Sequence, residues 1–390
     1  MLHRLYFSPG MFGFGRLASY DYFVHLERAL SERFRARSEQ VQTHVLQCSP
    51  TASIRRRAAK LAELVASTCQ NGGSGGPIHL IGHSTGGLDA RLVASPSASL
   101  AAPPDALAWR DRLASITTIN TPHFGTPLAS FFTTVSGERA LRALSALTIL
   151  GLTIGSPPLA AVGALVAALA RVDRALRLEL AVFDRATDAF LQMLDNARSK
   201  DVRNYIDAIQ KDQGAMVQLM PEAMDLFAAG IEDRPGIVRQ CVASMAPPPG
   251  PRLLPVLLHP WSIPSASIFS LIYRIAARYD SCYPCMAPDT PQDDEQMLAR
   301  AFGRTPGLRE NDGVVPLRSQ LWGKLVWVGY ADHLDVLGHF RDRQRKASSG
   351  PAHVDWLYSA SDFDRARFAA LVDAMMPGLV SRTEPLAKPA

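Results

Sequence analysis

Short runs of apolar residues recur along the chain at the length of buried strands, with longer amphipathic stretches between them. Six runs stand out: Leu5–Phe7, Val41–Leu46, Ile78–Ile81, Ile116–Ile119, Val238–Val242 and Leu325–Val328. Strands that alternate with amphipathic helices need crossover connections, which make neighbouring strands parallel. Right-handed crossovers then place helices on both faces of the sheet. We therefore predict an α/β fold with a doubly wound, mainly parallel sheet, which binds ligands at the carboxyl ends of its strands.

The strand pattern stops between residues 128 and 234, where nearly every stretch is compatible with a helix. Inside this segment, no charged residue occurs from Ala143 to Ala170. Three interpretations compete: a helical lid over the site, ordinary buried core, and insertion into a membrane. The sequence Gly155-Ser156-Pro157-Pro158 divides the apolar stretch into pieces shorter than the ~20 residues that a transmembrane helix needs. We therefore favour a helical lid or cap insertion.

The rest of the chain divides around this insertion. Residues 1–127 form the first part of the predicted core and residues 235–375 the second part. The second part includes a helical, proline-rich segment at 246–304. Residues 376–390 contain proline, lysine and small residues, which is typical of a flexible tail.

Composition fits a globular protein of 390 residues, with 47% hydrophobic and 20% charged residues. This length allows one large core, or a core domain with a substantial insertion. The net charge of +5 is spread thinly, and its densest cluster is Arg55-Arg56-Arg57. Because no aromatic residues are interleaved with this cluster, it favours a solvated helix face over a nucleic-acid interface.

The first residues, Met1 to Arg4, lead directly into a strand-like run without the apolar region of a signal peptide. We therefore expect a cytoplasmic protein, with association with a membrane or lipid surface through the apolar insertion as the alternative. The five cysteines should then be reduced thiols. Cys282 and Cys285 form a lone C-x-x-C, for which a local disulfide or two plain thiols are favoured over a metal site.

Candidate chemistry begins at Gly82-His83-Ser84-Thr85-Gly86, which lies between an apolar run and a helix-like stretch. A G-x-S-x-G sequence between a strand and a helix is the pattern of a nucleophile elbow. Gly82 and Gly86 then stand where the tight turn leaves no room for a side chain. Ser84 would lie at the helix N-terminus, where developing negative charge is favoured. The alternative is a glycine-rich turn with an inert serine.

A nucleophilic serine needs a base and a carboxylate that orients the base. Asp312 lies between the last two strand-like runs, although an Asp before Gly is also common in purely structural turns. Glu310 is the fallback for the carboxylate. His333 follows the last strand-like run, so we favour it as the base over His339 and the more remote His353.

The oxyanion of acyl transfer needs two hydrogen-bond donors. One should be the backbone N–H of Thr85, the residue after the nucleophile. The other should come from the loop after the first strand, where Gly10 allows close approach of the backbone. Met11 is the favoured donor in this loop and Phe12 is the alternative.

Together, these segments resemble the bacterial lipase and esterase branch of the α/β-hydrolase superfamily. The resemblance rests on Gly82–Arg91 (G-H-S-x-G-G-L-x-x-R), Thr121–Thr126 (T-P-H-x-G-T), Asn311–Val315 (N-D-G-V-V), His333–Asp335 (H-L-D) and the loop Pro9–Phe14. It implies a Ser84–Asp312–His333 triad, an oxyanion hole of Met11 and Thr85, and a helical lid. Two features depart from the family. Pro9-Gly10 stands where such lipases usually have His-Gly, and the leader of the secreted members is not seen in this sequence.

The resemblance also raises the question of a metal, because some members bind a structural calcium through the Asp of the H-x-D segment. That residue is Asp335 here, and Asp289 or Asp293 would be the upstream partner. One carboxylate is weak support for a cation that prefers six or more oxygen ligands, so calcium is disfavoured here and Asp335 could simply start a helix. We expect no other cofactor.

The expected function is therefore that of a serine carboxylic-ester hydrolase that forms an acyl-enzyme from apolar acyl esters. An acyltransferase or an intracellular polyester depolymerase, of the polyhydroxyalkanoate type, would use the same triad. A non-catalytic binding protein with this fold is disfavoured, because Ser84, Asp312 and His333 are all present. The expected partner is a small-molecule or lipid ester, with no nucleic acid.

Overall fold

The computed structural model describes residues 1–11, 16–17, 20–70, 76–154, 159–169, 178–194, 196–250, 262–342 and 351–380. Its central sheet has six strands: β1 (Leu2–Ser8), β4 (Gln40–Val45), β5 (Ile78–His83), β6 (Leu113–Ile119), β7 (Val238–Met245) and β8 (Lys324–Tyr330). Their order in the sheet is β4-β1-β5-β6-β7-β8, and every neighbouring pair is parallel. Each strand contains or overlaps one of the six apolar runs. A separate antiparallel pair, β2 (Arg16–Leu17) and β3 (Tyr20–Asp21), was not expected.

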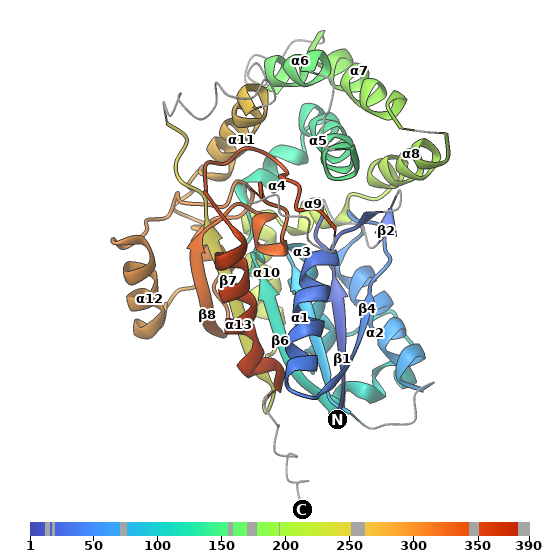
Figure 1. The fold of residues 1–390 in the computed structure, drawn as a ribbon, viewed down its shortest axis with the longest axis vertical. Coiled ribbons are helices and arrows are strands. Elements are labelled where there is room, and N and C mark those ends of the chain that lie inside the picture. Colours follow the sequence, from blue (N-terminus) through green and yellow to red (C-terminus); the bar gives the residue numbers. More distant parts are fainter. Residues whose placement is uncertain are drawn as a thin grey trace, which may run out of the picture.

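Helices cover both faces of this sheet, as the prediction of a doubly wound fold requires. Helices α1 (Val24–Ala36) and α13 (Arg365–Val380) lie side by side on one face, and α2 (Ile54–Gln70) and α3 (Thr85–Ala94) lie on the other (Figure 1). The side chains of β1 alternate between the faces. Phe7 packs in the apolar cluster that contains α1 and α13, whereas Tyr6 packs in the cluster that contains α2.

A long helical insertion separates β6 from β7. Its helices are α4 (Pro127–Phe132), α5 (Val135–Ile154), α6 (Leu159–Leu169), α7 (Leu178–Gln192), α8 (Asn196–Lys211), α9 (Gly214–Gln218) and α10 (Pro221–Gly230). Figure 1 shows α5 to α8 above the carboxyl ends of the strands. Helix α5 buries Leu144 and Leu147 in the main apolar cluster, and its Thr148 hydroxyl accepts a hydrogen bond from the Trp356 indole at 2.8 Å. This part of the uncharged stretch is therefore packed against the core.

Two further helices follow β7: α11 (Ser262–Ala276) and α12 (Gln292–Phe302). Short 3-10 turns complete the chain: η1 (Pro104–Arg112), η4 (Leu317–Gln320) and η5 (Asp335–Leu337). Among the described helices, none is long and apolar enough to cross a membrane. The split at 155–158 lies outside the described residues. Cys282 and Cys285 are both free thiols.

The C-terminal boundary differs from the predicted one. The tail was expected to begin at residue 376, but helix α13 continues to Val380. Met376 and Leu379 are fully buried, and this burial extends the helix past the proline at 377. Residues 381–390, the rest of the expected tail, lie outside the described part of the chain.

We predict that acid destabilises this fold through its buried histidines. Burial lowers the pKa of His25 to about 2, of His79 to about 3 and of His339 to about 4. These histidines take up protons near pH 6.5 only in the unfolded chain, so stability is lost as the pH falls below that value. Each should contribute up to about 1.4 kcal/mol per pH unit. Urea unfolding at pH 7.0 and 5.0 should therefore give a lower free energy of unfolding at pH 5.0.

His79→Gln provides the control, because it removes one of these groups and keeps the polarity of the site. The variant should show a shallower pH dependence than the wild-type protein. An identical dependence in both proteins would argue against this origin of acid sensitivity.

Candidate active site

Ser84 occupies a strained turn between β5 and α3. Its backbone has φ 54° and ψ −128°, a conformation that side chains rarely adopt. A Cβ on Gly82 would lie 2.3 Å from the carbonyl of Gly86, and a Cβ on Gly86 would lie 2.0 Å from the carbonyl oxygen of Ser8. Only glycine therefore fits at these two positions, as the sequence predicted. The serine itself is 4% exposed.

Asp312 and His333, which lie 21 residues apart, are in direct contact. The Nδ1 atom of His333 lies 2.7 Å from Oδ2 of Asp312. The backbone N–H of His333 also donates to the carbonyl oxygen of Asp312 at 3.0 Å. Both side chains are buried, and the Nε2 atom of His333 has no hydrogen-bond partner within the described chain. Nε2 is therefore the nitrogen of this ring that remains open for proton transfer.

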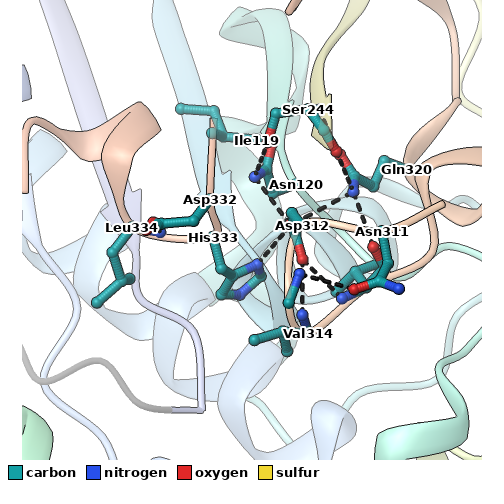
Figure 2. A network of polar contacts seen from close by, with 12 residues as sticks. Ile119, Asn120, Ser244, Asn311, Asp312, Val314, Gln320, Asp332, His333 and Leu334 are labelled. Atoms are coloured by element: carbon teal, nitrogen blue, oxygen red, sulfur yellow. Dashed lines mark hydrogen bonds and ion pairs between the residues drawn. The ribbon is translucent and has the colours of Figure 1, made fainter. Parts of the chain in front are cut away.

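Five donors hold the Asp312 carboxylate (Figure 2). Oδ1 accepts hydrogen bonds from the backbone N–H groups of Val314 and Val315 at 2.8 and 2.7 Å. Oδ2 faces His333 and accepts from the side-chain amides of Asn120 at 2.9 Å and Gln320 at 3.3 Å. In all of these contacts Asp312 is the acceptor, so the donors fix the orientation of its side chain toward His333.

Asn120 and Gln320 were missed in the sequence. Asn120 directly follows β6 and has a positive φ of 47°, which lets its side chain donate to Asp312 and also to the Ser244 hydroxyl at 2.7 Å. Asparagine tolerates this backbone region better than most residues. An Asn at the carboxyl end of a predicted strand was therefore a usable signal. Gln320 carried no comparable signal.

The predicted oxyanion loop lies directly against Ser84. A Cβ at Gly10 would be 2.5 Å from the Cβ of Ser84, so a side chain there would displace the serine. Met11 is buried, and its carbonyl oxygen accepts a hydrogen bond from the Tyr205 hydroxyl of α8 at 3.4 Å. Thr85 is the first residue of α3, so its N–H is not used by the helix. The alternative donor, Phe12, lies outside the described residues.

A buried ion pair holds the start of the predicted oxyanion loop through contacts with Ser8 and Pro9. The Arg57 guanidinium binds the Asp89 carboxylate, with a closest N–O distance of 2.8 Å, and both side chains are fully buried. Arg57 also donates to the carbonyl oxygen of Pro9, and the Ser8 hydroxyl donates to Asp89 at 2.7 Å. The expectation that Arg57 lies on a solvated helix face was therefore wrong. The adjacent Asp89 draws the guanidinium into the interior, and Arg56 remains outside.

The remaining candidates take other positions. Glu310 forms an ion pair with Arg304 at 2.7 Å. The Nε2 atom of His339 donates to the carbonyl oxygen of Tyr22 at 2.9 Å, and His353 lies 2.6 Å from the carbonyl oxygen of Gly338. None of these contacts reaches Ser84. The fallbacks therefore have structural partners of their own.

Asp335 belongs to a group of three carboxylates. Asp332, Asp335 and Asp355 offer oxygen atoms that all lie within 4.8 Å of one another. The expected upstream partners, Asp289 and Asp293, do not belong to this group. Sequence reasoning missed both other members: Asp332 lies in the same turn as Asp335, whereas Asp355 approaches only because the chain returns to this turn. Burial raises the pKa of Asp335 to about 6.

Comparison with known proteins shows what the chain is similar to. No protein-family model matches the chain. A triacylglycerol lipase from Vibrio cholerae is 33% identical over 146 residues, which is 37% of this chain and 40% of that protein. The match therefore spans less than half of the relative's length.

Among solved structures, EstA from Clostridium botulinum matches with a TM-score of 0.54 and 17% identity, over 97% of this chain and 88% of EstA. Lipase 1 from Pelosinus fermentans matches with a TM-score of 0.48 and 15% identity, over 96% and 98% of the two chains. The EstA match shows a shared fold. Together with the parallel sheet and the helical insertion between β6 and β7, it confirms the predicted fold class. The resemblance to bacterial lipases and esterases is likewise confirmed.

We predict that Arg57→Leu destabilises the protein strongly, because it leaves the buried Asp89 carboxylate without its cation. Breaking a buried pair on one side costs about 3–5 kcal/mol. Arg56→Leu is the matched control, since Arg56 is 69% exposed and pairs with Asp212 at the surface. That pair is worth about 1 kcal/mol or less. Urea unfolding of both variants measures the difference, and similar losses would contradict the role assigned to the buried pair.

Proposed function

We propose that this protein is a serine carboxylic-ester hydrolase of the lipase or esterase type, with Ser84, Asp312 and His333 as its triad. The observation that carries the proposal is the 2.7 Å contact between His333 Nδ1 and Asp312 Oδ2, with the Nε2 atom of that histidine left open. Ser84 stands at a strand-to-helix turn, the position from which such a base can activate a serine. The similarity to a triacylglycerol lipase supports the same class.

In the proposed reaction, Nε2 of His333 takes the Ser84 proton as the serine oxygen attacks the ester carbonyl. Asp312 keeps the other ring nitrogen protonated and stabilises the imidazolium that forms. The oxyanion is bound by the N–H groups of Met11 and Thr85. His333 then gives its proton to the departing alcohol, which leaves an acyl-enzyme. Water, activated by His333, releases the acid and regenerates the serine.

The substrate proposed is an ester with an apolar acyl chain. Support comes from the insertion, whose helices lie above the strand ends where Ser84 is located. Helix α6 contains no charged residue, and Gly163, Ala164 and Ala167 on one of its faces are exposed. An exposed apolar face on the insertion suits contact with an acyl chain or a lipid surface. In this proposal the insertion acts as a lid.

We predict that Ser84→Ala abolishes ester hydrolysis, with a loss of about 10⁶-fold in kcat if other serine triads are a guide. The measurement is hydrolysis of p-nitrophenyl esters from acetate to palmitate. Activity should rise toward the longer chains, because the insertion offers an apolar wall. Ser99→Ala, at an exposed serine, is the control and should leave activity unchanged.

Other outcomes discriminate between functions. A preference for acetate would support an esterase and weaken the acyl-wall interpretation of the insertion. Ester turnover that increases when an alcohol acceptor is added would favour an acyltransferase. Equal rates for the wild-type protein and Ser84→Ala would contradict the proposal.

The same proposal includes a structural calcium, which the fold family suggests. Asp332, Asp335 and Asp355 are the residues that would hold it. Two observations fit: Oδ2 of Asp332 is buried without a hydrogen-bond partner, and a cavity of about 30 Å³ is lined by Asp335 and Asp355. Oxygen-only ligands suit calcium. When bound, the ion would neutralise the repelling carboxylates and would fix the loop that carries His333.

We predict that calcium raises the melting temperature and that a chelator lowers it. Asp355→Asn should remove most of this response, because it takes one charge from the cluster and leaves the triad in place. Asp289→Asn is the control and should respond to calcium like the wild-type protein. The measurement is thermal unfolding with about 1 mM calcium or about 1 mM chelator. An unchanged melting temperature in the wild-type protein would rule the calcium out.

A further inference from the structure

His83, the last residue of β5, is bound at both ring nitrogens although it stands next to the nucleophile. It is fully buried. Its Nε2 atom lies 2.8 Å from the carbonyl oxygen of His333, and its Nδ1 atom lies 2.9 Å from the Tyr22 hydroxyl. A carbonyl oxygen can only accept, so Nε2 must carry the proton. Nδ1 then accepts from Tyr22, and the two contacts together select one neutral tautomer.

The contact with His83 completes the restraint of His333. On one side of this residue, the N–H of His333 donates to the carbonyl oxygen of Asp312 at 3.0 Å. On the other side, the carbonyl of His333 accepts from His83. The side chain is held by Asp312 through Nδ1. Each of these contacts leaves Nε2 of His333 free.

This arrangement ties the base to the strand that carries the nucleophile. His83 and Ser84 are consecutive, so the hydrogen bond from the His83 ring connects the residue beside the serine to the backbone of the histidine that would activate it. The two imidazole rings lie 4.7 Å apart at an angle of 53°, in contact without a bond between them. Rate depends steeply on such spacing, since a misplacement of about 1 Å can cost about 10²-fold.

We propose that His83 is a positioning residue for the base: its Nε2–H holds the His333 carbonyl and so sets Nε2 of His333 relative to Ser84. This inference rests on the function proposed above. Burial supports it, because burial holds the pKa of His83 well below its ordinary value and keeps the ring neutral. The oxyanion loop also touches this ring, since a Cβ at Gly10 would lie 3.3 Å from Nδ1 of His83.

The test compares His83→Gln with His83→Asn. The glutamine amide reaches as far as Nε2 and can restore the bond to His333, whereas the asparagine amide reaches only as far as Nδ1. We expect His83→Asn to lose about 10²-fold in kcat with KM changed less than about twofold, and His83→Gln to recover most of the loss. A rise in KM with kcat unchanged, or equal losses of kcat in both variants, would overturn the proposal.

His79 offers the matched control. It lies four residues earlier in β5, is equally buried, and contacts His3 and Ser115 instead of the site. His79→Gln and His79→Asn should lower the melting temperature and leave kcat unchanged. If the His79 pair lost kcat like the His83 pair, the effect would be general loosening of the strand, and the proposal would fail.

A readout without catalysis separates this inference from the proposed function. Amide hydrogen exchange over residues 331–337 reports how firmly the His333 loop is held. His83→Asn should speed this exchange and His83→Gln should not, whether or not the protein hydrolyses esters. Unchanged exchange in His83→Asn would contradict the positioning role. Undiminished ester hydrolysis by Ser84→Ala would contradict the proposed function alone.

Discussion

The close approach of three backbone segments at the end of β5 is the constraint on which the site depends. Gly82 and Gly86 face each other across the turn at a distance that excludes a Cβ, and Gly86 also touches the carbonyl of Ser8 on the neighbouring strand. Ser84, between them, accepts a positive φ. Such strain persists only where the surroundings fix it. Here β1 and β6 flank β5, so the sheet supplies the support that the turn needs.

The Arg57–Asp89 pair is the second requirement, and its energetics differ from those of the turn. Two charges buried together gain little net stability over a well-packed apolar pair, whereas one of them alone is costly. The main role of the pair is therefore to fix the positions of the groups that it binds. Arg57 reaches the carbonyl of Pro9, and Asp89 receives the hydroxyl of Ser8. These contacts place the loop at Gly10 against Ser84, so the buried charges determine where an oxyanion could bind.

Sequence patterns identified the parts of this structure that are determined by residues close together in the chain. The six strands followed from short apolar runs, and the turn at Ser84 followed from two glycines at fixed spacing. The pairing of Asp312 with His333 was predicted from the requirements of a serine nucleophile, because Asp312 lies between the last two strand-like runs and His333 directly follows the last one. These features need no knowledge of what packs against them.

The missed features depend on partners that are distant in sequence. Arg57 belongs to a basic run that is solvated at Arg56, and only the proximity of Asp89 makes its burial favourable. His83 has no local signal for a bond to His333, which lies 250 residues away. Asn120 is intermediate, because its place after β6 was visible but its partner was not. The helix at Met376 continues because its apolar face is covered, which composition alone does not reveal.

The loop that carries His333 combines these two kinds of determinant. Its start is fixed locally, by the end of β8 at Tyr330. Its course is fixed by distant groups, since His333 is held by Asp312 and His83 while its neighbour Asp332 belongs to the carboxylate cluster. Burial and the neighbouring carboxyl groups raise the pKa of Asp332 and Asp355, so ionisation of the cluster opposes the compact loop. The hydrogen bonds to His333 oppose its displacement. The position of His333 therefore depends on the carboxyl cluster on one side of the loop and on the hydrogen bonds to Asp312 and His83 on the other. A cation at the cluster and the ring of His83 would therefore both affect the position of Nε2 of His333 relative to Ser84.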